Sequence, residues 1–238
     1  MAIYLVPQIF PVLLAVLAAL AAPATAADTV KDIPRPMTSY YEYGDDNPSP
    51  QKNWCGNAAL KSVCGWVTEG QDVRRLDDIE KIFRQSVAYL SVRDGQASLL
   101  DLRWAAQGFR GFKGDELGKP QKGYGLEVRF QESARTEDGL FLMAKAIVDS
   151  GSPAIVPSEF GYTIGGRPIG HHWILVGYAQ RGNVKALRFK DVAKKSQEKN
   201  AREVSEYRVS DFLVKTQKGS PKIQCLVISK PKAPGSKG

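Results

Sequence analysis

The sequence predicts an α+β protein in which helices come first and an antiparallel sheet follows. Apolar residues recur at helical spacing between Cys55 and Gly108, whereas short alternating or continuous apolar blocks dominate after Leu126. A turn at Arg181-Gly182-Asn183 separates two of those blocks. Runs of helices followed by runs of strands are typical of α+β folds. The chain of 238 residues is long enough for one sizeable core, or for one domain with two lobes.

Three helices are expected in the first half of the chain. The first begins at Cys55 and has one apolar face, formed by Cys55, Ala59, Leu60, Val63 and Cys64. A second covers residues 76–90, where apolar side chains follow the i, i+3, i+4 pattern. A third runs from an N-cap at Ser98 to a stop at Gly108.

The second half is expected to form the sheet. Residues 136–150 are the exception, because they have a helical pattern that ends at Gly151. The blocks on either side of the 181–183 turn should pair as an antiparallel hairpin. The expected strands cover residues 126–130, 153–156, 173–178, 184–189 and 223–229.

The N-terminus has the pattern of an export signal. Residues 1–27 contain no charged side chain, and a short apolar core is followed by the small residues Ala24-Thr25-Ala26. The domain prediction is therefore a signal peptide at 1–26, an extended lead-in at 27–50, a main domain at 51–229 and a disordered basic tail at 230–238. An uncleaved N-terminal anchor is the alternative. After signal cleavage we expect no transmembrane segment and a secreted or periplasmic protein in an oxidising compartment.

The composition excludes several kinds of site. Three cysteines and two adjacent histidines make a poor zinc cage and close at most one disulfide, so neither a metal nor a cofactor is expected. The net charge of +8 belongs entirely to the part of the chain after the signal. The chain also has a basic run formed by Lys194, Lys195, Lys199 and Arg202. We interpret this run as a solvated face that could contact an anionic surface or polymer, without specific nucleic-acid binding.

Cys55 has the position expected of a reactive thiol. A helix N-terminus offers unpaired N–H groups and a positive dipole end, both of which stabilise a thiolate. Gly56 is expected to leave space beside the sulfur for a substrate carbonyl. Cys64 points to the other side of the helix, so it is either a core thiol or a disulfide partner of Cys225.

The base that activates this thiol must be His171 or His172, the only imidazoles in the chain. Strand alternation sends their side chains to opposite faces, so only one can meet the thiol, and His172 is favoured because it directly precedes the apolar run. A catalytic histidine also needs a group that orients its second nitrogen. Asp191 ends the next strand across the hairpin and is the candidate for that role.

These motifs resemble those of papain-like cysteine peptidases, most closely the bacterial C39-like and C70-like branches. The resemblance covers about residues 47–192 and is carried by Cys55-Gly-Asn-Ala-Ala-Leu60, by Gly170-His-His-Trp173 with its apolar run, and by Asp191. It implies a two-lobed fold with the nucleophile helix in an N-terminal helical lobe and the sheet in a C-terminal lobe. It also implies that Cys55 is the nucleophile, His172 the general base and acid, Asp191 the orienting residue and Gln51 an oxyanion donor.

The predicted function is therefore an exported cysteine peptidase that cleaves a peptide or protein substrate through a thioacyl intermediate. Gln51 lies closer to Cys55 than the glutamine of the family does, so a catalytically inactive papain-like binding domain is the alternative. A basic protein that binds an anionic surface without catalysis is a third interpretation. Acyl transfer to an amine uses the same order of Cys, His and Asp, but nothing in the sequence marks an amine acceptor.

Overall fold

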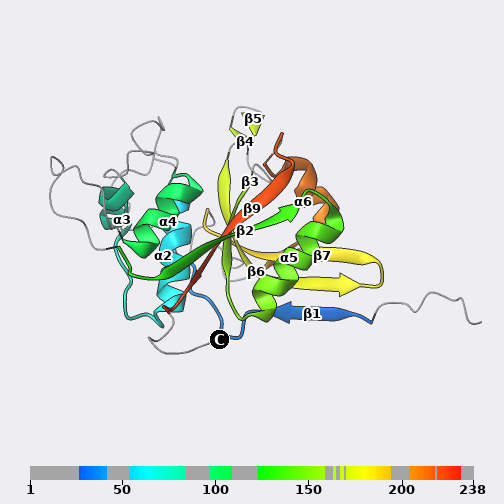
Figure 1. Cartoon of the computed structure of the whole chain (residues 1–238), viewed down its shortest axis with the longest axis horizontal. Coiled ribbons are helices and arrows are strands. Elements are labelled where there is room, and N and C mark those ends of the chain that lie inside the picture. Colours follow the sequence, from blue (N-terminus) through cyan, green and yellow to red (C-terminus); the bar gives the residue numbers. More distant parts are fainter. Residues whose placement is uncertain are drawn as a thin grey trace, which may run out of the picture.

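A computed structural model shows a seven-stranded antiparallel sheet with helices on both faces (Figure 1). The structure describes residues 27–41, 54–83, 97–108, 123–158, 163–164, 167–168, 170–193, 204–217 and 219–231. The predicted signal peptide, Gln51, the end of the expected 76–90 helix and most of the predicted basic tail lie outside the described residues. Within the described part of the chain, no helix is both long and apolar enough to span a membrane.

The elements follow the expected order. The helices are α2 (Cys55–Val67), α3 (Leu76–Phe83), α4 (Leu99–Gln107), α5 (Glu137–Asp149) and α6 (Val209–Lys215). The strands of the main sheet are β1 (Thr29–Asp32), β2 (Glu127–Ala134), β3 (Ala154–Ser158), β6 (His171–Arg181), β7 (Val184–Asp191), β8 (Ser205–Arg208) and β9 (Lys222–Ser229). A separate small pair is formed by β4 (Thr163–Ile164) and β5 (Arg167–Pro168).

Local sequence signals explain where these helices start and stop. Ser98 caps α4 in a capping box with Asp101, and the chain leaves the helix at Gly108 with a positive φ of 86°. Thr136 caps α5 by accepting a hydrogen bond from Gly139 N. The expected N-cap of α4 at Ser98 and its expected stop at Gly108 are confirmed.

The main sheet has the strand order β2-β9-β3-β6-β7-β8, and β1 pairs with β6 beyond the end of β3. Every pairing in it is antiparallel. The central strands β3, β6 and β9 are buried on both faces, which explains their nearly continuous apolar sequences. The α+β class is confirmed.

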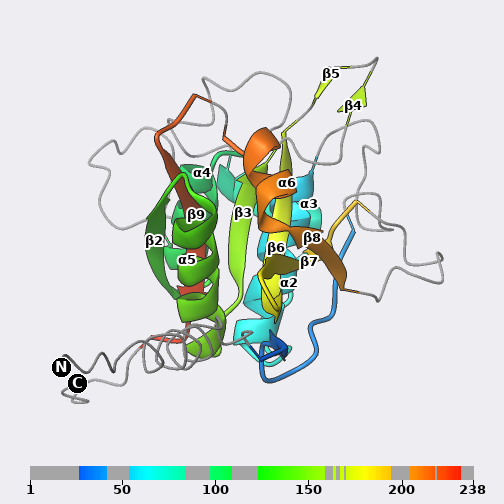
Figure 2. The same cartoon turned by 90° about the vertical axis from the view of Figure 1, so that its right-hand side faces the viewer.

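Alternating residues of the central strands feed two separate cores. One core packs Ile155, Ile174 and Leu226 against α2, α3 and α4, and the other packs Val156, Trp173 and Val227 against α5 and α6. Figures 1 and 2 show α2–α4 on one side of the sheet and α5 and α6 on the other. The N-terminal helical lobe is therefore present, and the sheet lobe carries its own helical cover on the far face.

Candidate active site

Cys55 is the first residue of α2, and this helix is buried almost throughout its length. Its N-cap, Trp54, makes no side-chain capping bond to the N–H groups of the first turn. These groups and the positive end of the helix dipole favour negative charge at the sulfur. Ala58 and Ala59 are fully buried, because small residues let neighbouring layers approach the helix closely.

Gly56 has a different role from the expected one. A Cβ atom at Gly56 would lie 2.9 Å from the Cβ of Ala97, which precedes α4, and 3.6 Å from Cε1 of His172. The space beside Gly56 is thus filled by Ala97 and is not open for a substrate carbonyl, which corrects the sequence-based expectation. Glycine is needed here because α4 begins so close to α2.

The structure brings Cys55 and His172 together from 117 positions apart in the sequence. The Sγ atom of Cys55 lies 3.3 Å from Nδ1 of His172, the second residue of β6. Both residues are buried, with 2% of Cys55 and 7% of His172 exposed. Burial, followed by the charge of neighbouring His171, lowers the pKa of His172 to about 3. The imidazole is therefore neutral at pH 7 and can accept the proton of a Cys55 thiol.

His171 points to the opposite face of the sheet, as strand alternation predicts. Its Nε2 lies 3.1 Å from Oδ1 of Asp191, and its ring meets Trp173 edge-on with 5.4 Å between the ring centroids. Asp191 Oδ1 also accepts a hydrogen bond from Ala193 N at 2.9 Å. The expectation that Asp191 orients His172 is thus corrected, because its carboxylate contacts the neighbouring His171.

A β-bulge explains this change of partner. Continuing the regular pairing of the hairpin, from Arg181 opposite Val184 to Gly177 opposite Arg188, would place Asp191 opposite Ile174 on the His172 face. The register shifts between Leu175 and Gly177, so Asp191 instead lies opposite Trp173. A slip of one residue moves a side chain to the other face of a sheet, which puts Asp191 on the side of His171.

Two residues close to Cys55 in the sequence, Gln51 and Trp54, carry side-chain N–H groups. Gln51 lies outside the described residues, so its predicted role as an oxyanion donor stays a prediction. Trp54 lies directly before Cys55 and is its buried neighbour. Its indole Nε1 is buried and has no hydrogen-bond partner in the described part of the chain.

The other two cysteines lie in the cores, and none of the three cysteines forms a disulfide in the described structure. Cys64 belongs to the core on the α2 side and Cys225 to the core on the α5 side, so the sheet separates them. Burial raises the pKa of Cys64 well above its ordinary value and raises that of Cys225 to about 12. The interpretation of Cys64 as a core thiol is confirmed.

A helical layer on an antiparallel sheet, with a cysteine at a helix start facing a histidine at a strand start, defines a papain-like, cysteine-peptidase-like fold. The chain belongs to the Peptidase_C39 like family, whose sequence model matches residues 38–215. Among solved structures, the chain is similar to UfSP from C. elegans, with a TM-score of 0.56 and 10% sequence identity. That match covers 91% of this chain but only 37% of UfSP. None of the curated proteins matches the sequence.

Proposed function

We propose that the chain is an exported cysteine peptidase that hydrolyses peptide or amide bonds with Cys55 as nucleophile and His172 as base. The 3.3 Å contact between Cys55 Sγ and His172 Nδ1 carries this proposal. Membership of the Peptidase_C39 like family supports a protein or peptide substrate. The fully buried Cys64 and Cys225, with their raised pKa values, leave Cys55 as the nucleophile candidate.

The reaction would begin with transfer of the Cys55 proton to Nδ1 of His172. The thiolate then attacks the carbonyl carbon, a C–S bond forms, and the C=O π electrons move onto oxygen. His172 next gives its proton to the leaving nitrogen as the C–N bond breaks, which leaves a thioester on Cys55. A water molecule that loses its proton to His172 attacks this thioester and releases the acid and the free thiol.

The oxyanion formed in each step would be stabilised by backbone N–H groups at the start of α2, with Gln51 as the expected side-chain donor. One such donor is typically worth about 3–4 kcal/mol of transition-state stabilisation. The low pKa of His172 describes a resting pair in which the imidazole is neutral. A thiolate formed 3.3 Å away is an opposite charge, which favours the imidazolium and balances the cost of burial.

Export and the partners of the chain are part of the same proposal. The uncharged apolar N-terminus with its small-residue cleavage pattern supports a secreted or periplasmic location. The +8 charge that follows it supports contact with an anionic surface or polymer.

One observation favours a second function. Cys55 is only 2% exposed, and Ala97 packs against Gly56 beside it. A sealed thiol is what a catalytically inactive papain-like binding domain would have. In this alternative the protein only binds a partner. Cys55→Ala should then leave that binding unchanged.

Digestion of a peptide library by the purified chain, followed by mass spectrometry, separates the two functions. We expect new peptide termini with the wild-type chain, and none with Cys55→Ala or His172→Ala. The Cys64→Ala variant is the matched control and should cleave like the wild type. Cleavage that persists in Cys55→Ala would overturn the peptidase proposal. The proposal would also fail if the wild-type chain left the library intact and its Cys55 did not react with thiol reagents.

A further inference from the structure

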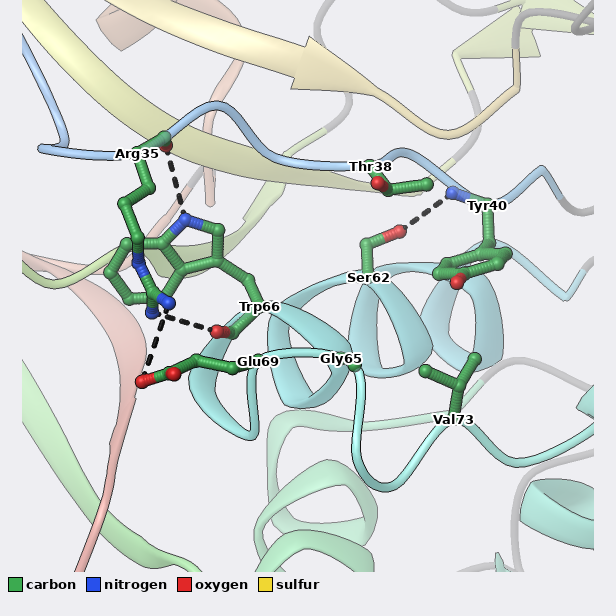
Figure 3. Close-up of a pocket in the computed structure, with 9 residues that line it drawn as sticks. Arg35, Thr38, Tyr40, Ser62, Gly65, Trp66, Glu69 and Val73 are labelled. Carbon is green, nitrogen blue, oxygen red and sulfur yellow. Dashed lines mark hydrogen bonds and ion pairs between the residues drawn. The ribbon is translucent and has the colours of Figure 1, made fainter.

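The segment 28–40, here called the clamp, contacts both β6, the strand that carries His172, and α2, the helix that carries Cys55. It starts as β1 beside β6, with Thr29 opposite Gln180 and Asp32 opposite Gly177. It then runs along α2 as far as Ser62, where Tyr40 N donates a hydrogen bond to Ser62 Oγ at 2.9 Å (Figure 3). The sequence predicts an extended lead-in here. Such a segment can be either a removable prosegment or a permanent part of the domain.

On the β6 side, the clamp meets the strand at its bulge. Ile33 N donates a hydrogen bond to Val176 O at 2.7 Å, at the point where the β6–β7 register shifts. Gly177 is required at this crossing, because a Cβ there would lie 2.6 Å from Lys31 O and would also collide with the Asp32 carboxylate. The glycine of the His-His-Trp-Ile-Leu-Val-Gly motif therefore serves the clamp.

Charged side chains fix this end of the clamp to the sheet. Arg188 on β7 donates from Nε and Nη2 to the two carboxylate oxygens of Asp32 at 2.7 and 2.9 Å. Lys31 pairs with Asp149 of α5 at 2.8 Å, and Asp28 accepts a hydrogen bond from Gly182 N at 3.1 Å. A bidentate arginine–carboxylate pair is the strongest of these contacts because its geometry is fixed.

On the α2 side, Ile33 and Met37 are buried in the same core as Cys55. Arg35 and Trp66 bind each other in both directions, since Trp66 Nε1 donates to Arg35 O at 3.1 Å and Arg35 Nη2 donates to Trp66 O at 3.0 Å. The Arg35 guanidinium also lies 4.6 Å from the centre of the Trp66 ring. Figure 3 shows these contacts at one end of a pocket of about 220 Å³ between the clamp and α2, with the Tyr40–Ser62 bond at its other end.

We propose that the clamp is a permanent positioning element of the enzyme and is not a removable prosegment. This inference rests on the proposed function of Cys55 and His172, which lie on separate elements that the clamp binds together. By holding the bulge of β6 and the outer surface of α2, it keeps His172 Nδ1 within reach of Cys55 Sγ. Removing or loosening it should slow the chemistry of the thiol, because small misplacements of reacting groups cost large factors in rate.

The test uses the chain from residue 27 to residue 238 and measures the rate of Cys55 alkylation by iodoacetamide from pH 5 to 9. Gly177→Ala should push β1 off β6, and Arg35→Ala should loosen the clamp on α2. We expect each to lower the rate at Cys55 by about tenfold or more and to change its pH profile. The matched control is Ile223→Val in the other core, which should lower the melting temperature without changing the rate at Cys55.

The inference would be overturned if Arg35→Ala kept the wild-type alkylation rate and pH profile at Cys55 while Gly177→Ala either did the same or failed to fold. Isolation of active protein that lacks residues 28–40 would also overturn it. The proposed function fails separately, if wild-type Cys55 reacts no faster than Cys64 and Cys225. A fast wild-type Cys55 whose rate survives both clamp variants would leave the peptidase proposal standing and remove only the clamp.

Discussion

Two neighbouring histidines have different partners because they occupy alternate positions of one strand. His172 meets the thiol of Cys55 in the core beneath α2, whereas His171 meets the carboxylate of Asp191 on the α5 side. Each imidazole is buried, but only His171 has a carboxylate beside it in the described structure. The environment of each ring thus supports the proposal that His172 is the base, whereas His171 binds Asp191.

The buried neutral state of His172 predicts a pH-dependent stability. Its pKa is about 3 in the folded chain and about 6.5 when unfolded, so between these values the unfolded chain binds more protons. The free energy of unfolding is therefore not reduced by this residue above pH 6.5. It falls as the pH drops from 6.5 toward 3, because the unfolded chain takes up a proton that the folded chain does not. We expect a slope of up to about 1.4 kcal/mol per pH unit from this group. Urea unfolding at several pH values measures it.

His172→Gln is the control for this slope, because glutamine keeps a polar side chain that does not titrate. The variant should lose stability less steeply between pH 6.5 and 5 than the wild type. Equal slopes in both proteins would show that His172 does not titrate with a lowered pKa.

Close packing at Gly56 predicts a second effect at the residue scale. Gly56→Ala places a methyl group 2.9 Å from Ala97 Cβ, and such overpacking typically costs about 1–3 kcal/mol of unfolding free energy. Ala97→Gly in the same chain should restore most of that loss, because it removes the opposing methyl group. Urea unfolding of both single variants and the double variant measures the coupling, and strictly additive losses would contradict the contact.

At the scale of elements, α4 links a helix cap to the site. Ser98→Ala removes the capping box at the start of α4 and should cost about 1 kcal/mol. Because Ala97 packs against Gly56 beside Cys55, we also expect a changed rate of Cys55 alkylation. Thr136→Ala, which removes the cap of α5 on the other face of the sheet, should cost a similar amount and leave the alkylation rate unchanged. Equal effects of both variants on Cys55 would disprove the link.

The bulge in β6 makes a further prediction about Asp191. Since its carboxylate binds His171 across the sheet from Cys55, Asp191→Ala should lower stability and slow Cys55 alkylation far less than His172→Ala does. Alkylation rates of the two variants, compared at pH 7, test this difference. A loss in Asp191→Ala as large as that in His172→Ala would restore the predicted triad.

The sequence was sufficient for the elements that carry strong local signals. The cap at Ser98, the start of α2 and the hairpin turn at 181–183 are each decided by residues close together in the chain. It missed β1, β8 and α6, because the strands have only four residues each and α6 has seven, too few for a clear apolar period.

The site divided in the same way. The contact of Cys55 with His172 could be predicted because a helix start and a strand start are local features. The partner of Asp191 could not, because it depends on the single-residue bulge between Leu175 and Gly177. Pairing register comes from contacts between strands, and in this chain the clamp contacts β6 at the bulge.

At the scale of the whole molecule, one sheet separates two cores with different tasks. The core under α2–α4 contains Cys55 and the buried clamp residues. In the core under α5 and α6, the ring of Phe189 contacts the rings of both Trp173 and Phe212. The three thiols are distributed over this architecture, with Cys55 at a helix start and Cys64 and Cys225 within the cores. The fold thus makes one cysteine different from the other two.

The central claim is that Cys55 is a nucleophile activated by His172, and the alkylation rate of each cysteine tests it most directly. Mass spectrometry after timed exposure of the folded chain to iodoacetamide at pH 7 gives the three rates. We predict that Cys55 reacts at least about tenfold faster than Cys64 and Cys225, and that His172→Ala removes most of this advantage. Equal rates at the three cysteines, or a rate at Cys55 that His172→Ala leaves unchanged, would contradict the account.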